Sequence, residues 1–400
     1  MKKRFFQLTA ILLAVLFLQG GGIPCSATEA HTVENAAPEV SDLGIENGSL
    51  NLDCKSAILM EATTGAILYA QNAEQALPPA SVTKIMTLLL IMEAVDAGTV
   101  HLDDVVSVSA NAASMGGSQV YLKEGEQMTL EDLLKSVVIA SANDAAVALA
   151  EYVGGSVDAF VAKMNQKAKT LGMSATNFEN VTGLDDTVEN HLTSAKDIAL
   201  MSRALIAHPT VLQYSSLWMD SIRDGAFGLT NTNRLVRFYR GCTGLKTGST
   251  SAAGFCVSAT AERNGFSLIC VIMGAESRDV RNAEATALLD WGFANFDLYT
   301  AEAGKTAPIR VTGGNVSFCN GVYPAFSIVL PKADIGEVKQ SIELPDAVPA
   351  PIRTGDPIGS ILFECRGQLL AKIEITAQDQ VNRINLFEIV GRLLAKFLLI

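Results

Sequence analysis

The sequence predicts an α+β fold, in which strands from both ends of one domain form a single antiparallel sheet around an inserted helical region. Two apolar, strand-like segments lie early in the chain, at 54–60 and 66–70, with a turn at Thr63-Thr64-Gly65 between them. Three more follow much later, at 242–247, 254–261 and 267–273, the last two separated by Arg263-Asn264-Gly265. We expect these early and late strands to pair in one sheet.

Helical segments occupy the region between the two groups of strands. A long apolar segment at 85–97 ends at Gly98, and residues 129–132 open the next one in the pattern of a capping box. That segment ends near Ala140, where Ser141-Ala142-Asn143 interrupts it. The other helical segments are 145–152, 157–171, 193–207 and, closing the domain, 283–296.

The composition changes after residue 300, which indicates further units. Residues 305–382 alternate apolar runs with Gly, Pro and Asp turns and predict a small all-β domain. Residues 384–400 predict an amphipathic helix, which either packs on its own domain or lies on a membrane surface as an anchor. Its terminal position and strongly apolar face favour the anchor. The apolar face carries Leu386, Ile389, Val390, Leu393, Leu394, Phe397 and Ile400, opposite Asn385, Glu388, Arg392 and Lys396.

The first 48 residues predict export. Residues 1–27 have the layout of a secretory signal peptide, with a basic start, an apolar run and small residues for cleavage near Ala27 or Ala30. Residues 28–48 are acidic and poor in large apolar residues, as in a flexible leader. The first folded domain would then span 49–300. We expect the protein at the outer face of the cytoplasmic membrane, held peripherally by the C-terminal helix.

Charge and cysteine content narrow the possible partners. The formal net charge of −12 argues against nucleic acid. Six cysteines follow the signal, and an even number in an exported chain permits disulfides, whereas Cys256 and Cys270 in apolar strands favour buried thiols. No cluster of His, Cys and acidic residues has metal-ligand spacing, so we expect no metal and no cofactor.

Three short motifs carry the possible chemistry. Ser81 and Lys84 lie three residues apart at the start of a helix, so hydroxyl and amine can meet on one face, and Ser81 falls where a helix cap is expected. Lys84 can act as a base only if its pKa falls by about 3 units, a differential interaction of about 4 kcal/mol. Apolar burial and a second cation would both lower it. Ser141-x-Asn143 falls at a helix break, and Lys246-Thr247-Gly248 at a strand end.

Each motif alone is more often an ordinary cap, turn or surface residue. Together and in this order they resemble the signature of the penicillin-recognising serine enzymes, the penicillin-binding proteins and serine β-lactamases. The resemblance is most specific to low-molecular-mass penicillin-binding proteins of the D-alanyl-D-alanine carboxypeptidase type. It covers roughly 51–295 and is carried further by 79–84, 141–145, 190–195, 244–249, 281–284 and 288–293.

This resemblance implies a β-lactamase/transpeptidase-like sheet with an inserted helical region, followed by the small β-domain and the terminal helix. It implies that Ser81 attacks the carbonyl between two terminal D-alanines and that Lys84 takes its proton. Ser141 would relay a proton to the leaving amine. Lys246 would be the second cation, which lowers the pKa of Lys84.

The resemblance also implies the substrate-binding residues. Asn143 would hold the substrate backbone, and the backbone N–H groups of Ser81 and Ser249 would form the oxyanion hole. Thr247, Ser249 and Arg281 would receive the terminal carboxylate. Two departures from related patterns are Ser-Ala-Asn, where class A β-lactamases have Ser-Asp-Asn, and Ser249, at a position that varies within the family.

We therefore expect a serine-type D-Ala-D-Ala carboxypeptidase that trims peptidoglycan stem pentapeptides and is acylated by β-lactam antibiotics. One alternative is a β-lactamase on the same core, and another is a wall-binding protein with a vestigial site. A Ser-His-Asp hydrolase is disfavoured, because His101, His191 and His208 have no Gly-x-Ser-x-Gly partner.

Overall fold

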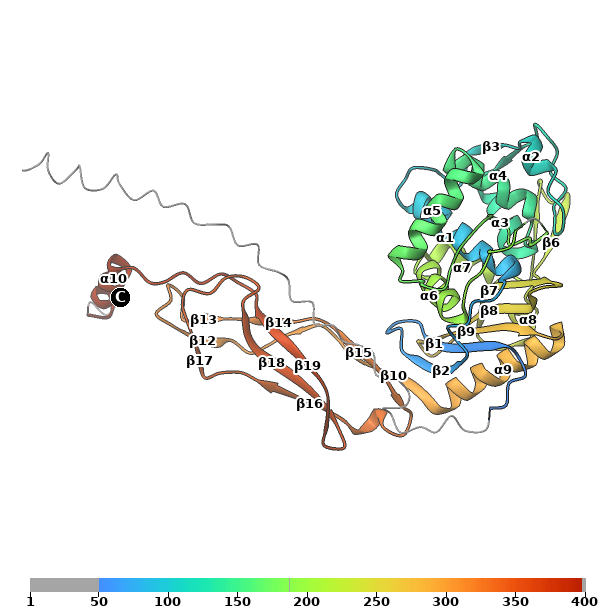
Figure 1. Ribbon diagram of the computed structural model, residues 1–400. Helices are drawn as coiled ribbons and strands as arrows, with labels where there is room; N and C mark the ends of the chain where they lie inside the picture. Colours follow the sequence, from blue (N-terminus) through green and yellow to red (C-terminus); the bar gives the residue numbers. More distant parts are fainter. Residues whose placement is uncertain (1–49, 187, 398–400) are drawn as a thin grey trace, which may run out of the picture. The chain divides into compact units, whose positions relative to one another are not determined.

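The computed structural model describes residues 50–186 and 188–397 of the 400-residue chain (Figure 1). The expected signal peptide at 1–27 and leader at 28–48 lie outside these residues, as does Ile400 of the C-terminal helix. The described part begins with a mixed domain of one sheet and many helices. It continues through a series of strands to a terminal helix.

A five-stranded antiparallel sheet in the order β2-β1-β9-β8-β7 is the centre of the first domain. The first strand, β1, pairs with the last one, β9, since Ser56 of β1 lies opposite Met273 of β9. This confirms the prediction that both ends of the domain contribute to one sheet. The strands are β1 (Ser56–Glu61), β2 (Ile67–Gln71), β7 (Cys242–Thr250), β8 (Gly254–Arg263) and β9 (Phe266–Ala275).

Local sequence explains the strand pairing. β1 is buried at every position, as expected for a strand covered on both faces. β8 and β9 are joined through Asn264 and Gly265, whose φ angles of 55° and 81° suit the tight turn that an Asn-Gly pair favours. The predicted strands and turns therefore agree with the structure to within a few residues.

Helices cover both faces of this sheet (Figure 1). One face carries the inserted helical region, and a large apolar cluster including Ile85, Leu133 and Ile269 fills the space between them. The opposite face is covered by α9 (Arg278–Asn295) through a second cluster that includes Leu268 and Leu288, and Leu235 of the short helix α8 also belongs to this cluster. The inserted helices are α1 (Lys84–Asp96), α2 (Ala110–Ala113), α3 (Leu130–Ala140), α4 (Asn143–Gly154), α5 (Val157–Thr170), α6 (Ala195–Ile206), α7 (Pro209–Ser215) and α8 (Leu235–Phe238).

Two parts of the inserted region differ from the prediction. Ser81 is not a helix cap: it lies inside a 3-10 helix (Ala80–Thr83) that leads into α1, and neither helix has a side-chain cap. The segment after α6, to which the sequence analysis assigned no element, forms α7 and the hairpin of β5 (Met219–Ile222) and β6 (Phe227–Thr230). These short elements lack the periodicity that identifies longer ones. A further small pair joins β3 (Val105–Ser107) to β4 (Gln127–Thr129).

The region after α9 consists of strands around a smaller apolar core that includes Ile361, Phe363 and Ile375. Its sheets have the orders β10-β15, β11-β14-β19-β18-β16 and β13-β12-β17, and this confirms the expected all-β character. The strands are β10 (Phe296–Ala301), β11 (Gly304–Lys305), β12 (Ile309–Thr312), β13 (Phe318–Cys319), β14 (Gly321–Tyr323), β15 (Phe326–Pro331), β16 (Val338–Glu343), β17 (Ala347–Pro349), β18 (Pro357–Cys365) and β19 (Gln368–Ala377).

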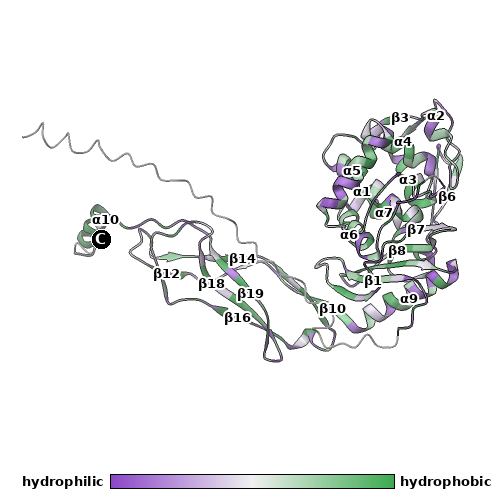
Figure 2. Cartoon of the chain, in the orientation of Figure 1, coloured by the Kyte–Doolittle hydropathy of each residue, from purple (hydrophilic) through white to green (hydrophobic). Residues whose placement is uncertain are grey.

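The C-terminal helix α10 (Leu386–Phe397) forms as the sequence predicts. Its large apolar side chains are exposed, Phe387 by 88% and Phe397 by 91%, and Figure 2 shows the helix in the green of hydrophobic residues. In the described residues no single helix is long and apolar enough to cross a membrane. Only α4 and α5 together, bent by 83°, meet that test by length and composition.

All six cysteines of the described part are free thiols, and all except Cys242 are buried. Burial raises the pKa of Cys54 to about 12 and that of Cys242 to about 11. Thiols of this kind stay protonated and behave as small apolar groups. Of the two alternatives left open by the sequence, the structure therefore has buried thiols.

Candidate active site

The 3-10 helix before α1 brings a serine and a lysine together. Ser81 lies in this helix and Lys84 is the first residue of α1, so the two side chains project on the same side. Lys84 Nζ lies 2.9 Å from Ser81 Oγ and donates a second hydrogen bond of 2.9 Å to the backbone oxygen of Thr182. Ser81 is partly exposed, whereas Lys84 is fully buried. A partly exposed hydroxyl thus lies beside a buried amine.

The environment of Lys84 favours its uncharged form. Burial lowers the pKa of Lys84 well below its ordinary value, and the nearby charge of Lys246 lowers it further. The carboxylate of Asp144 opposes these effects but is the weaker influence. A neutral amine beside a hydroxyl can accept the hydroxyl proton, which is the requirement that the sequence motif left open.

A buried histidine holds the nucleophile turn in place. His191 Nδ1 accepts a hydrogen bond of 3.0 Å from the backbone N–H of Glu179. Nε2 therefore carries the proton and donates to Thr83 Oγ1 over 2.7 Å. Burial lowers the pKa of His191 to about 4, so the ring stays neutral. It contacts Thr83 and not Ser81, which removes the support for a Ser-His-Asp arrangement.

The junction between α3 and α4 supplies Ser141 and Asn143. Ser141 ends α3 in the left-handed conformation, with φ of 64°, which turns the chain abruptly into α4. The backbone N–H of Asn143 donates to Ser118 O, and its Nδ2 donates to Gly116 O, both over 2.7 Å. Within the described residues, the buried Ser141 Oγ and Asn143 Oδ1 have no hydrogen-bond partner. Unpaired buried polar atoms of this kind are candidates for ligand contact.

Strand β7 supplies the Lys246-Thr247-Gly248 motif and lies close to Ser81. A Cβ placed on Gly248 would lie 2.8 Å from the backbone N of Ser81 and 2.8 Å from Pro79 O. Only glycine allows this contact. Lys246 is buried one strand position before Thr247, and its Nζ donates to Thr247 O over 3.1 Å. Burial, with the charge of Arg281, lowers the pKa of Lys246 to about 7.

Arg281 lies in the first turn of α9 and is only 2% exposed, so it is not a surface residue. Its Nε and Nη2 donate to Asn282 Oδ1, and its Nη1 lies 3.4 Å from Cys256 O. Burial and the neighbouring Arg278 lower its pKa to about 10, which still leaves it charged at neutral pH. A buried, charged guanidinium at this place can bind an anion.

One cleft of about 560 Å³ connects these elements. The predicted residues Ser81, Ser141, Thr247, Ser249 and Arg281 line it, while Lys84, Asn143 and Lys246 are buried. The other lining residues, which the sequence did not indicate, are Ser118, Trp218, Thr230, Asn231, Thr232, Arg234, Phe238, Gly248 and Arg278. Among these additional residues, only Gly248 could be identified from the sequence, because it belongs to the Lys246-Thr247-Gly248 motif. Among the described residues no group of His, Cys, Asp or Glu is placed to hold a metal ion.

Comparison with known families defines the class of the protein. A family model described as D-alanyl-D-alanine carboxypeptidase, peptidase S11, matches residues 44–277. A second one, described as the C-terminal domain of penicillin-binding protein 5, matches residues 298–383. The protein is therefore a hydrolase of the peptidase class. It belongs to the S11 family of D-alanyl-D-alanine carboxypeptidases.

Individual relatives agree with this assignment. D-alanyl-D-alanine carboxypeptidase DacF of Bacillus subtilis is 39% identical over 87% of this chain and 91% of its own. DacC of Escherichia coli is 34% identical over 84% and 86%. Among solved structures, penicillin binding protein 5 from Haemophilus influenzae is 31% identical with a TM-score of 0.74, covering 83% of this chain and 98% of its own. Penicillin-Binding Protein D2 from Listeria monocytogenes, in the ampicillin-bound form, is 34% identical with a TM-score of 0.57, covering 61% and 99%.

The close approach at Gly248 generates a test of the site geometry. Gly248→Ala should force β7 away from the 3-10 helix, because the added Cβ meets backbone atoms that cannot rotate aside. We expect about a 100-fold loss of carboxypeptidase kcat/KM, the size of effect that a displacement near 1 Å can produce. Gly228→Ala is the control, since a Cβ there meets nothing within 4 Å. Full activity in Gly248→Ala would show that the approach of β7 is not needed.

Proposed function

We propose that this protein removes the terminal D-alanine from peptidoglycan stem pentapeptides through an acyl-enzyme on Ser81, and that β-lactams acylate the same serine. The observation that carries the proposal is the 2.9 Å contact between Ser81 Oγ and the amine of a fully buried Lys84. Membership of the S11 family supports the choice of substrate.

Acylation begins when Ser81 Oγ attacks the carbonyl carbon between the two terminal D-alanines. Lys84 Nζ takes the hydroxyl proton, and the tetrahedral oxyanion lies against the backbone N–H groups of Ser81 and Ser249. As the C–N bond breaks, a proton reaches the leaving amine through Ser141. Free D-alanine departs, and the rest of the peptide stays as an ester on Ser81.

Substrate position is set by groups on two sides of the cleft. Asn143 Oδ1, which has no partner among the described residues, accepts a hydrogen bond from the peptide backbone. Thr247, Ser249 and the charged Arg281 receive the terminal carboxylate. Such a cluster supplies local positive charge in a chain with a net charge of −12. The buried Lys246 acts on the site through its charge, which lowers the pKa of Lys84.

Water then hydrolyses the ester and restores Ser81, and the shortened peptide leaves with a new carboxylate. A β-lactam would enter the same path, with its ring amide in place of the scissile peptide bond. The relative solved with ampicillin bound supports this part of the proposal. A β-lactamase on the same core would have to deacylate quickly, and a wall-binding protein with a vestigial site would not acylate at all.

Ser81→Ala tests the covalent mechanism. The variant should lose both D-alanine release from a pentapeptide and labelling by a fluorescent penicillin, because Ser81 is the hydroxyl that lies within hydrogen-bond distance of the Lys84 amine. A chase with unlabelled penicillin on the unaltered protein separates the alternatives: persistent label supports a carboxypeptidase, and rapid loss supports a β-lactamase. Covalent label retained in Ser81→Ala would contradict the mechanism.

Arg281→Ala tests carboxylate recognition. A hydrogen bond to a charged group contributes about 1.5–3 kcal/mol, so kcat/KM on the peptide should fall roughly 10- to 150-fold. Arg263→Ala serves as the matched control, since Arg263 pairs with Asp290 away from the cleft. With a substrate whose terminal carboxylate is amidated, Arg281→Ala should lose little further. An equal loss on both substrates would assign Arg281 a structural role only.

We further propose that α10 anchors the protein to the outer face of the cytoplasmic membrane. Its apolar side chains are exposed, including Leu393 by 62% and Leu394 by 56%, which does not fit a helix packed on its own domain. Arg392 supplies positive charge for anionic headgroups, although it also donates to Asn315 O. With 12 residues at about 1.5 Å each, the described helix suits the interface plane.

Removal of α10 tests the anchor. The cut belongs after Asn385, because Val381 is buried and bonded to Ile352, and Arg383 donates to Ala350 O. The shortened protein should keep its kcat on a small peptide and lose sedimentation with anionic liposomes. A full-length form with Leu393→Gln and Leu394→Gln should behave in the same way. Unfolding or loss of activity on truncation would make α10 a structural part of the β-domain.

A further inference from the structure

A short segment, Gly116–Leu122, forms part of the cleft wall and also holds Asn143. Ser118 lines the cleft. Asn143 donates its backbone N–H to Ser118 O and its Nδ2 to Gly116 O, whereas its Oδ1 has no partner among the described residues. The position of this segment therefore decides where Asn143 Oδ1 points.

The segment is held from one side by Asp144, the residue after Asn143. The buried carboxylate of Asp144 accepts hydrogen bonds from the backbone N–H of Val120, at 3.1 Å, and of Leu122, at 3.0 Å. Between them Tyr121 has a φ of 59°, in the left-handed region that residues other than glycine seldom adopt. A conformation of this kind persists only when the surroundings impose it.

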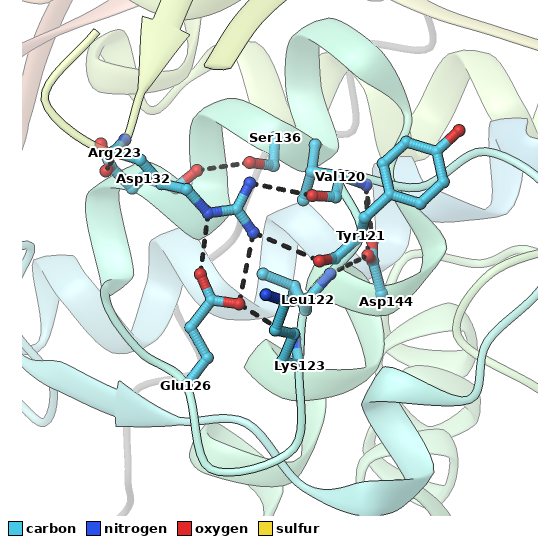
Figure 3. Close-up of polar contacts among 9 residues, drawn as sticks. All are labelled: Val120, Tyr121, Leu122, Lys123, Glu126, Asp132, Ser136, Asp144 and Arg223. Carbon is cyan, nitrogen blue, oxygen red and sulfur yellow. Dashed lines mark hydrogen bonds and ion pairs between the residues drawn. The ribbon is translucent and has the colours of Figure 1, made fainter. Parts of the chain in front are cut away.

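Arg223 holds the same segment from the other side (Figure 3). Its Nη1 donates to Val120 O over 2.9 Å, and its Nη2 lies 3.5 Å from Tyr121 O. Its Nε donates to Glu126 Oε1 over 2.7 Å, and this bond lowers the pKa of Glu126. The backbone N–H groups of Val120 and Leu122 thus face Asp144. The carbonyl groups of Val120 and Tyr121 face Arg223.

Arg223 also connects this segment to another part of the chain that contributes to the cleft. It follows β5 at the tip of the β5–β6 hairpin, whose base carries the cleft residues Trp218 and Thr230. Its own backbone N–H donates to Asp132 Oδ2 over 3.2 Å, which fastens the tip to α3. One guanidinium therefore connects two segments that lie about 100 residues apart in sequence.

We propose that Arg223 is a positioning residue for the acyl-transfer reaction: it holds Gly116–Leu122 so that Asn143 Oδ1 stays aimed at the substrate backbone. This role rests on the proposed function of Asn143. Arg223 touches no reacting atom, and it acts through the carbonyl of Val120 and the carboxylate of Glu126. Its planar fork matters, because a lysine could pair with Glu126 but could not reach the carbonyls as well.

Arg223→Ala should lower kcat/KM for D-alanine release about 10- to 100-fold, as expected when a substrate-positioning group is misplaced. Arg223→Lys should give an intermediate loss. The matched control is Arg203→Ala, because Arg203 also donates to two backbone carbonyls, those of Ala62 and Thr63, at a turn away from the cleft. Thermal unfolding of Arg223→Ala and Arg203→Ala checks that the two variants have similar losses in unfolding temperature. Arg203→Ala should nevertheless keep its activity.

A double-variant cycle separates positioning from general support. Asn143→Ala should cost less activity in the Arg223→Ala background than alone, because Asn143 is already misplaced there, whereas it should act additively with Arg203→Ala. Additive effects with Arg223→Ala, or equal losses in both arginine variants, would overturn the inference. If Arg223→Ala does not fold, Glu126→Gln should show the same non-additivity with a smaller loss. An inactive unaltered protein would instead contradict the proposed function.

Discussion

Burial of the Lys84 amine beside Ser81 is the constraint on which the rest of the site depends. An ammonium group with no access to water is disfavoured, so burial lowers the pKa of Lys84 and favours the neutral amine that the proposed reaction needs. The apolar cluster between the sheet and the inserted helices creates that burial, and the hydrogen bond to Thr182 O orients the amine. The proposed activation of Ser81 therefore depends on the helix–sheet interface.

The site combines parts of both layers at this interface. The inserted helical region contributes the Ser81 turn and the α3–α4 junction, and the sheet contributes β7. Contact between the layers depends on the missing side chain of Gly248. This division explains why the helical region interrupts the strands instead of following them, since a cleft between layers needs residues from each.

Several polar side chains around the site hold its backbone in place and have no part in the proposed reaction. His191, neutral and buried, fixes Thr83, while Asp144 fixes the backbone that carries Ser118. A buried polar group that makes its hydrogen bonds fixes its neighbours without the free-energy penalty of an unpaired buried polar atom. In contrast, Ser141 Oγ and Asn143 Oδ1 are buried without partners in the described residues, and Ser141 lines the cleft. The pattern of satisfied and unsatisfied atoms separates supporting residues from those proposed to meet the substrate.

The sequence by itself determined the strands of the central sheet, the principal helices, the all-β character of the later region and the three motifs. Those features arise from local periodicity, turn residues and short spacings, such as the three residues between Ser81 and Lys84. It placed Ser81 wrongly as a cap and missed α7 and the β5–β6 hairpin, whose short segments have no period. Only the tertiary structure decided the burial of Arg281, the approach of β7 at Gly248 and the contacts of Arg223. These depend on groups far apart in the chain, and no local pattern encodes the distance between them.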